Sequence, residues 1–200
     1  MITSPINHIV ASVMAIILLV IAASIVATVF GTATERILTL FFISLIAVVG
    51  MGVYSGNSGI LSFGHLSFMA IGAYAASILT LPSQLKIATL PKLPEWLATT
   101  ELGLLNATIF AVLLTSVVAS VIGLAIGKLE GSAAVITTLG LLIIVHGVLI
   151  GWRDVTRGSQ TFFGIPRETT LWVAATGVII ALVAARFYRD SISGLRLRAG

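Results

Sequence analysis

The sequence predicts an all-α fold, a polytopic bundle of transmembrane helices with about six spans. Three observations predict it. Of the 200 residues, 58% are hydrophobic and only 9% are charged, whereas a soluble domain usually has roughly 25% charged residues. The mean hydropathy is +1.15. Apolar runs recur along the whole chain, and each is long enough to cross a bilayer.

The six predicted spans follow from the length of these runs. Crossing about 30 Å of hydrocarbon takes about 17 to 25 mostly apolar residues. Six stretches qualify, and none has an acidic residue in its interior: 9–30, 37–54, 60–81, 102–126, 132–150 and 171–188. The two longest connections, 82–101 and 151–170, can carry surface structure. Trp96, Trp152 and Trp172 lie in or beside them, where an amphipathic ring suits the headgroup layer.

Basic residues near the helix ends predict the orientation. Over the whole chain they are balanced, five on one side against six on the other, but four arginines fall within thirteen positions near the end: Arg186, Arg189, Arg196 and Arg198. The positive-inside rule places this end in the cytoplasm, and with six spans the other end lies there too. We expect a multi-pass protein of the inner (plasma) membrane, with 1–188 as the transmembrane domain and 189–200 as the start of a cytoplasmic segment.

The stretch 50–80, GMGVYSGNSGILSFGHLSFMAIGAYAASILT, is rich in glycine and hydroxyl groups. Polar groups in hydrocarbon are costly unless protein or water satisfies them, so this stretch faces protein or a cavity. On a helix over 57–80, one stripe carries these residues: Ser58, Ser62, His65, Met69, Gly72 and Ala76. Two interpretations stay open. The stripe packs against another helix, or its first four members line a polar path.

Residues 55–59 predict an interruption of the third span, because they include two glycines and no helix-favouring residue. The break is expected at Gly56, Asn57 and Gly59, as a discontinuous or re-entrant helix near 55–65. A half-helix that starts there would expose its N–H groups, which is how many transporters bind a carboxylate.

His65 is the only side chain in 50–80 that can carry a charge near neutral pH, and intramembrane ionisable residues are functional candidates. It either contacts a ligand or ties two helices together. His146 has no polar neighbour within a turn and is expected to be a structural hydrogen-bonding residue. Two histidines on separate helices without a carboxylate make a poor metal site, so we expect neither a metal nor a cofactor. The eleven Lys and Arg form no single patch, which argues against nucleic acid.

Small residues at four-residue spacing end the fourth run: Ala119, Gly123, Gly127 and Gly131. This pattern lets helices cross closely, so we expect it to pack against another helix. After the sixth run, the tail from Arg186 to Gly200 becomes basic and amphipathic. It suits either anionic lipid or a docking partner.

Four segments resemble the permease subunits of branched-chain amino-acid ATP-binding-cassette (ABC) importers, of the larger type that pairs with a second, related permease. They are 50–74, 127–141, 155–166 and 189–200. The most specific is S-x-G-H-x-x-F followed by G-A-Y, at 62–68 and 72–74. Such permeases continue for several further helices, so we expect this chain to be C-terminally truncated. It departs from its relatives at 132–134 and at Arg157, where they usually have aromatics and a glycine.

The resemblance implies a translocation subunit that is not itself an enzyme and moves branched-chain, hydrophobic amino acids. The expected partners are a second homologous permease, two cytoplasmic ATPase subunits, a periplasmic or extracellular solute-binding protein and the lipid bilayer. The approach to the ATPase is expected at Arg189, Gly194, Arg196 and Arg198. Importers of urea and short amides share the same permease family, which leaves a second substrate class open.

Two other classes of protein are weaker alternatives. An ion-coupled secondary transporter usually relies on an intramembrane carboxylate, and none lies inside the six runs. A membrane scaffold or an intramembrane hydrolase is the other class. The hydrolase would need a nucleophile and a base on facing helices, for which Ser62 and His146 are a conceivable pair.

Overall fold

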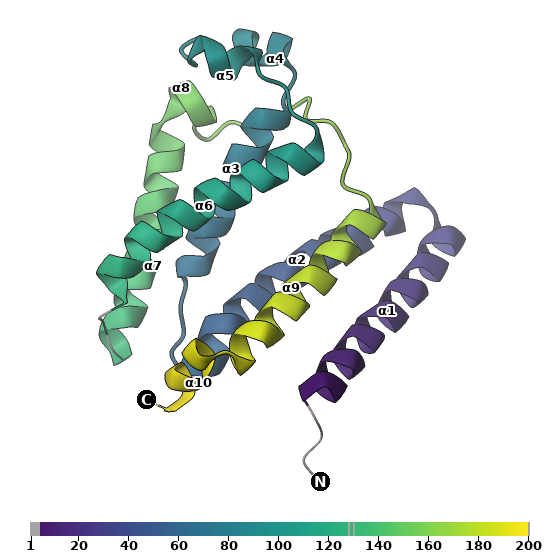
Figure 1. Ribbon diagram of the computed structural model, residues 1–200. Coiled ribbons are helices and arrows are strands. Elements are labelled where there is room, and N and C mark those ends of the chain that lie inside the picture. Colours follow the sequence, from purple (N-terminus) through teal and green to yellow (C-terminus); the bar gives the residue numbers. More distant parts are fainter. Residues whose placement is uncertain (1–4, 128, 130, 200) are drawn as a thin grey trace. The chain divides into compact units, whose positions relative to one another are not determined.

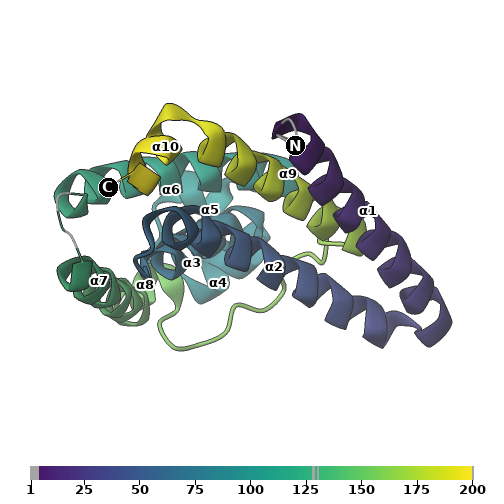
Figure 2. The ribbon, with the colours of Figure 1, turned by 90° about the horizontal axis from the view of Figure 1, so that it is seen from below.

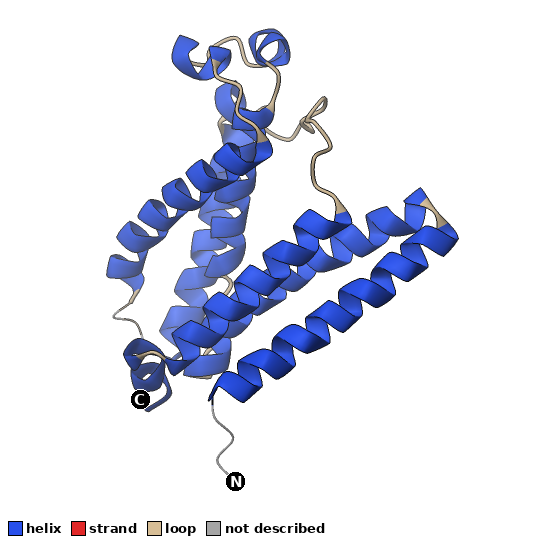
Figure 3. Cartoon of the chain, turned by 45° about the vertical axis from the view of Figure 1, so that its right-hand side comes forward, coloured by secondary structure: helices blue, strands red, loops and turns tan. Residues whose placement is uncertain are grey.

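The computed structural model describes residues 5–127, 129 and 131–199 (Figure 1). In these ranges the regular structure is helical, without strands, which confirms the predicted all-α class. Figure 3 shows the helices joined by loops, the longest of which runs over 157–170. The chain forms two compact units, 1–61 with 169–200, and 62–168. Each unit is described by itself.

The first unit contains α1 (Pro5–Phe30), α2 (Thr32–Ser58), α9 (Leu171–Asp190) and α10 (Ile192–Ala199). Its core lies where α1, α2 and α9 meet, and Phe42 and Val178 are fully buried there. Gly177 lets α2 and α9 approach, because a Cβ at this position would lie 2.9 Å from Ile46 Cδ1. Figure 1 shows α2 and α9 side by side along most of their length.

The second unit contains α3 (Gly64–Thr80), α4 (Ser83–Thr89), α5 (Glu95–Thr99), α6 (Leu104–Ile126), α7 (Gly131–Gly151) and α8 (Arg153–Thr156). The helix α3 contacts both α6 and α7. At its C-terminal end the chain turns by 114° into α4 at Pro82, whose ring cannot continue a helix. A small core joins α3, α4, α5 and their connection, with Ile78, Leu90, Leu93 and Ala98 buried.

The buried residue Lys86 holds the connection between α3 and α6 together. Its side chain is fully buried, and its ammonium donates to the carbonyl of Leu97 at 3.3 Å and to that of Thr100. These carbonyls lie at the end of α5, where helical carbonyls lack partners. Nearby, Glu101 accepts a hydrogen bond from the N–H of Ser83. Both contacts fold the connection back onto itself.

Within the described residues, five helices are long and apolar enough to cross a membrane: α1, α2, α6, α7 and α9. The helix α3 reaches the length and hydropathy of a span only together with α4, across the 114° bend, and the pair counts as a sixth span if both parts cross together. Large apolar side chains cover the outside of these helices; Leu124, for example, is 80% exposed. This is the surface that a helix presents to lipid, so the prediction of a polytopic multi-pass protein is confirmed.

The chain is interrupted within the predicted region near 55–65, but two of the three residues predicted to break the helix lie in α2. Gly56 and Asn57 belong to the last turns of α2, which ends at Ser58, and the irregular segment runs over 59–63. The helix persists because the Asn57 side chain donates to the Val53 carbonyl at 2.6 Å and Ser58 Oγ to the Tyr54 carbonyl at 2.9 Å. In a membrane, retained backbone bonding outweighs the weak helix propensity of glycine and asparagine.

Candidate functional site

In the first unit, the predicted break residues form the end of α2. Gly59 has φ 70° and caps the helix, with its N–H bonded to the Ser55 carbonyl at 3.0 Å. This left-handed conformation is the usual helix ending at glycine. Ser58 Oγ also accepts a hydrogen bond from the Ile60 N–H at 3.2 Å. Of the three predicted break residues, only Gly59 therefore takes part in the break.

In the second unit, the N-terminus of α3 is fixed by two hydroxyl groups. Ser62 Oγ accepts a hydrogen bond from the Gly64 N–H at 3.3 Å, and Thr138 Oγ1 of α7 accepts one from the Phe63 N–H at 3.4 Å. Gly64 is buried against Thr138, so α3 starts in direct contact with α7. Two of the N–H groups expected to face a ligand are thus already satisfied within the chain.

His65 lies in the first turn of α3 and is half-buried. Its Nδ1 is 3.0 Å from the carbonyl oxygen of Ser62. A carbonyl can only accept, so the ring must carry its proton on Nδ1. In the neutral imidazole, Nε2 is then left as a hydrogen-bond acceptor. The local fold therefore sets the tautomer and prepares this ring to accept from an ammonium or an amide N–H.

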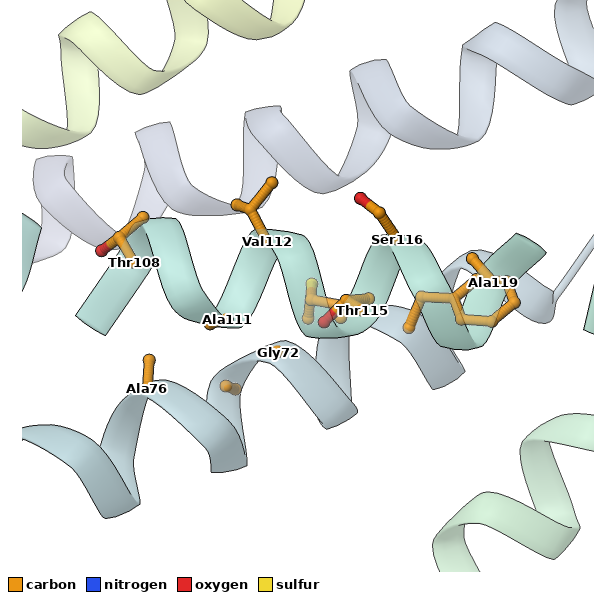
Figure 4. A pocket seen from close by; sticks show the side chains of 11 residues that line it. Gly72, Ala76, Thr108, Ala111, Val112, Thr115, Ser116 and Ala119 are labelled. Carbon is orange, nitrogen blue, oxygen red and sulfur yellow. The ribbon is translucent and has the colours of Figure 1, made fainter. Parts of the chain in front are cut away.

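An open groove of about 450 Å³ runs between α3 and α6 in the second unit. The lining residues from α3 are Phe68, Met69, Gly72, Ala73 and Ala76, and those from α6 are Thr108, Ala111, Val112, Thr115, Ser116 and Ala119. Figure 4 shows Ala111 and Thr115 on the side of α6 next to Gly72. The wall is mainly apolar, with three hydroxyl groups from α6.

Among the described residues of this unit, two hydroxyl groups are buried without a hydrogen-bond partner, those of Ser67 and Thr115. Ser67 is fully buried in α3. Thr115 Oγ1 lies close to the backbone of α3, 3.2 Å from where a Cβ of Gly72 would be. A buried hydroxyl without a partner costs free energy, so these positions are unusual for purely structural residues.

The structure brings only some of the predicted lining residues together. Met69 lines the α3–α6 groove, while His65 lies in the first turn of the same helix and Ser62 lies just before it. Ser58 belongs to the first unit. The proposed single stripe over 57–80 is wrong, because the chain between Gly59 and Phe63 is not helical and only the residues from His65 onwards share a helix.

The predicted packing face of α6 makes fewer contacts than expected. Ala119 lines the groove, but a Cβ at Gly123 or Gly131 would meet no atom within 4 Å in the described chain. Gly127 caps α6, with its N–H bonded to the Gly123 carbonyl at 2.8 Å. The close approach of α6 to α3 uses Ala111, which is buried and lines the groove between the two helices. Packing at Gly123 stays a prediction.

The basic tail folds back as α10 (Figure 2). Gly194 makes this possible, because a Cβ there would lie 2.2 Å from the Tyr188 carbonyl oxygen. The Arg198 guanidinium donates to the carbonyls of Gly194, at 3.4 Å, and of Arg189. Arg196 is exposed. Of the predicted approach to the ATPase, two residues therefore hold α10 on α9, while Arg196 presents its charge outward.

A family model described as the permease component of branched-chain amino acid transport systems matches residues 33–199. The chain belongs to this family. The match confirms the resemblance found in the sequence. No curated protein and no solved structure gives a match. The described part of the permease holds no group of three or more His, Asp or Glu side chains that could bind a metal ion.

Sequence reasoning missed several residues that shape the site of the permease. Thr138 receives the start of α3, and Thr115 faces Gly72 across the groove. Both are threonines inside apolar runs, which is the signal that could have drawn attention to them. Lys86 was also missed, since a single lysine in a connecting segment looks like an ordinary surface residue until the fold buries it.

Proposed function

We propose that this permease is the membrane-spanning subunit of an ABC importer that moves branched-chain, hydrophobic amino acids into the cell. The observation that carries the proposal is the family match over 33–199, on a chain with five or six apolar spans. The chain contributes a path and a docking surface, and partner ATPases supply the energy. The proposed assembly is the one expected from the sequence, with a second permease, two ATPase subunits and a solute-binding protein, in the inner membrane.

The α3–α6 groove and the start of α3 are the proposed lining of the path. The apolar side chains of Phe68, Met69 and Val112 suit a branched aliphatic side chain. The hydroxyls of Thr108 and Ser116 suit the polar end of an amino acid. His65, with Nε2 as an acceptor, suits the substrate ammonium group. Movement of α3 against α6 is eased by Gly72, where no side chain interlocks the helices.

The proposed docking surface for the ATPase is α10 and its exposed Arg196. In this proposal Gly194 and Arg198 act as positioning residues, because they hold α10 against the end of α9. The basic character of the helix favours an acidic partner surface.

The test is uptake by the complete complex in proteoliposomes, with the binding protein outside and ATP inside. We expect labelled leucine or valine to accumulate only with hydrolysable ATP, and to be unaffected when an ionophore removes the membrane potential. Competition by unlabelled isoleucine supports the amino-acid assignment. Competition by urea or acetamide, without competition by isoleucine, would assign the permease to short amides. Uptake that follows the ion gradient and ignores ATP would overturn the proposal.

A further inference from the structure

A basic pocket of about 230 Å³ lies between α2 and α9 within the first unit. It is formed where both helices end: Gly52, Gly56 and Asn57 come from α2, and Leu182, Arg186 and Arg189 from α9. The transport path proposed above does not use this pocket, which belongs to the other unit.

The pocket exists because α2 carries glycines at 52 and 56, one turn apart on the same face of the helix. A Cβ at either position would meet no atom within 4 Å, so the space beside them is open. Asn57 is only 9% exposed, and its side-chain amide is held by the Val53 carbonyl at 2.6 Å. One wall is therefore small and fixed in place.

The opposite wall is positively charged. Arg186 and Arg189 line the pocket from the last turns of α9, and Arg198 lies nearby because its guanidinium donates to the Arg189 carbonyl. The neighbouring acidic residue, Asp190, is exposed and does not line the pocket. Guanidinium groups bind phosphate oxygens in bidentate geometry, with charge-assisted hydrogen bonds. The charge of this wall thus complements a phosphate.

The position along α9 indicates where such a phosphate lies. Trp172, near the other end of the helix, is exposed and suits one membrane interface. From Trp172 to Arg189 the helix rises about 26 Å at 1.5 Å per residue, which is close to the hydrocarbon thickness of roughly 30 Å. Arg189 is therefore at the level of the opposite headgroups. At about 230 Å³ the pocket is smaller than a typical ligand site and takes a headgroup rather than a whole lipid.

We propose that this pocket binds the headgroup phosphate of an anionic phospholipid. The glycine face of α2 admits the phosphate, and the two arginines bind it. Basic pockets between transmembrane helices are known to hold acidic lipid headgroups. This site would keep the ends of α2 and α9 together, independently of which substrate the permease carries.

The test uses the full chain in neutral detergent micelles, with phosphatidylglycerol, phosphatidylcholine or inorganic phosphate added. Native mass spectrometry counts retained lipids, and a thermal melt gives Tm. We expect phosphatidylglycerol to be retained and to raise Tm, phosphatidylcholine to do so weakly, and inorganic phosphate not at all. The double variant R186Q/R189Q should retain phosphatidylglycerol about tenfold less for each lost contact. R196Q, which removes one positive charge outside the pocket, should retain phosphatidylglycerol as the unaltered chain does.

Gly56→Leu tests the pocket without changing any charge. Because the space beside Gly56 is open, the leucine should fill it and reduce retention of phosphatidylglycerol while the chain still folds. Equal losses of retention per removed charge in R196Q and R186Q/R189Q would overturn the proposal in favour of diffuse surface charge. Full stabilisation by inorganic phosphate would overturn it in favour of a free anion. Loss of ATPase assembly, with lipid retention unchanged in the double variant, would assign the pocket to a protein partner.

Discussion

His65 is the residue whose chemistry the local structure defines most closely. Because Nδ1 donates to the Ser62 carbonyl, only Nε2 is available to a ligand. The sequence predicted the importance of this histidine from its isolation in an apolar run. It could not predict the tautomer, which depends on how the chain turns between Gly59 and Gly64.

The first prediction concerns transport through this ring. His65→Leu should reduce leucine uptake by about tenfold or more, because it removes the acceptor for the substrate ammonium group, while the complex still assembles. The measurement is uptake in proteoliposomes, with assembly followed by size-exclusion chromatography. His146→Leu is the matched control, since this histidine lies on α7 and is exposed. Equal uptake in both variants would remove His65 from the path.

The second prediction concerns Ser67, whose buried hydroxyl has no partner. Ser67→Ala should leave Tm unchanged or raise it, because the substitution removes an unsatisfied polar group that costs about 1–3 kcal/mol. Ser62→Ala should instead lower the stability by about 0.5–1.5 kcal/mol, since Ser62 Oγ accepts from the Gly64 N–H. Thermal melts of the two variants in the same detergent compare them directly. A large loss of Tm in Ser67→Ala would mean that the hydroxyl has a partner in the assembled membrane protein.

Among the helices, the crossing of α3 and α6 depends on a lack of side chain at Gly72. A Cβ there would lie 3.2 Å from Thr115 Oγ1, which is tighter than an ordinary contact. Gly72→Leu should therefore separate the helices and destabilise the unit by about 1–3 kcal/mol. Gly123→Leu is the control on the same helix pair, because its Cβ would meet no atom. Thermal melts measure both, and equal stability of the two variants would contradict this account of the crossing.

The connection between α3 and α6 should respond to pH. The Ser83 N–H holds the pKa of the Glu101 carboxyl below its usual range, and burial lowers the pKa of Lys86 while the Glu101 charge raises it. A carboxyl with a lowered folded pKa stabilises above its ordinary pKa, and this contribution is lost as the pH falls through the lowered value. Hydrogen exchange of 82–101 should thus quicken in acid, after correction for the intrinsic rate.

Two variants separate the contributions to this connection. Glu101→Gln should remove the acid dependence, because the amide does not titrate in this range. Lys86→Met should weaken the connection at every pH, since the carbonyls of Leu97 and Thr100 lose their donor, at about 1–3 kcal/mol. An acid response that persists in Glu101→Gln would assign the effect to another group.

The positions of the long helices along the chain were more predictable than the residues at which they end. Apolar runs identified the positions of α1, α2, α6, α7 and α9, because crossing a bilayer constrains length more strongly than any local propensity does. The end of α2 was predicted too early, since side chains of Asn57 and Ser58 support the helix through back-bonding that composition does not reveal. The small helices α4 and α5 depend on Lys86 and on a local core, so no periodic pattern of apolar residues predicted them.

At the scale of the whole molecule, the number of spans predicts which connections share a side of the membrane. One span, α6, separates Trp96 from Leu129, and two spans, α7 and α9, separate Leu129 from Ile192. Because the chain has no cysteine, single cysteines can be introduced at these three positions. A membrane-impermeant thiol reagent applied to intact cells should label position 96 and leave 129 and 192 unlabelled until the membrane is opened. Labelling of 129 together with 96 would contradict the assignment of α6 as a span.

The division into two units was not predictable from the sequence. The units meet along the chain at residues 61 and 169, of which the first lies inside an apolar run and the second in a polar connection like several others, and the apolar runs on both sides look alike. The pairing of α2 with α9 depends on small residues such as Gly177, which fit a partner far away in sequence. The pattern of apolar residues along one chain carries no signal for contacts between segments so far apart.

This pairing has a consequence for biosynthesis. Phe42 is buried by a helix that begins more than a hundred positions later, at Leu171. While the ribosome is still producing the intervening segment, α2 lies in the bilayer without its contact to α9, so Phe42 is not yet packed against that helix. Non-local contacts of this kind form late. Nascent chains stopped before α9 are therefore the species that quality-control proteases and chaperones should recognise.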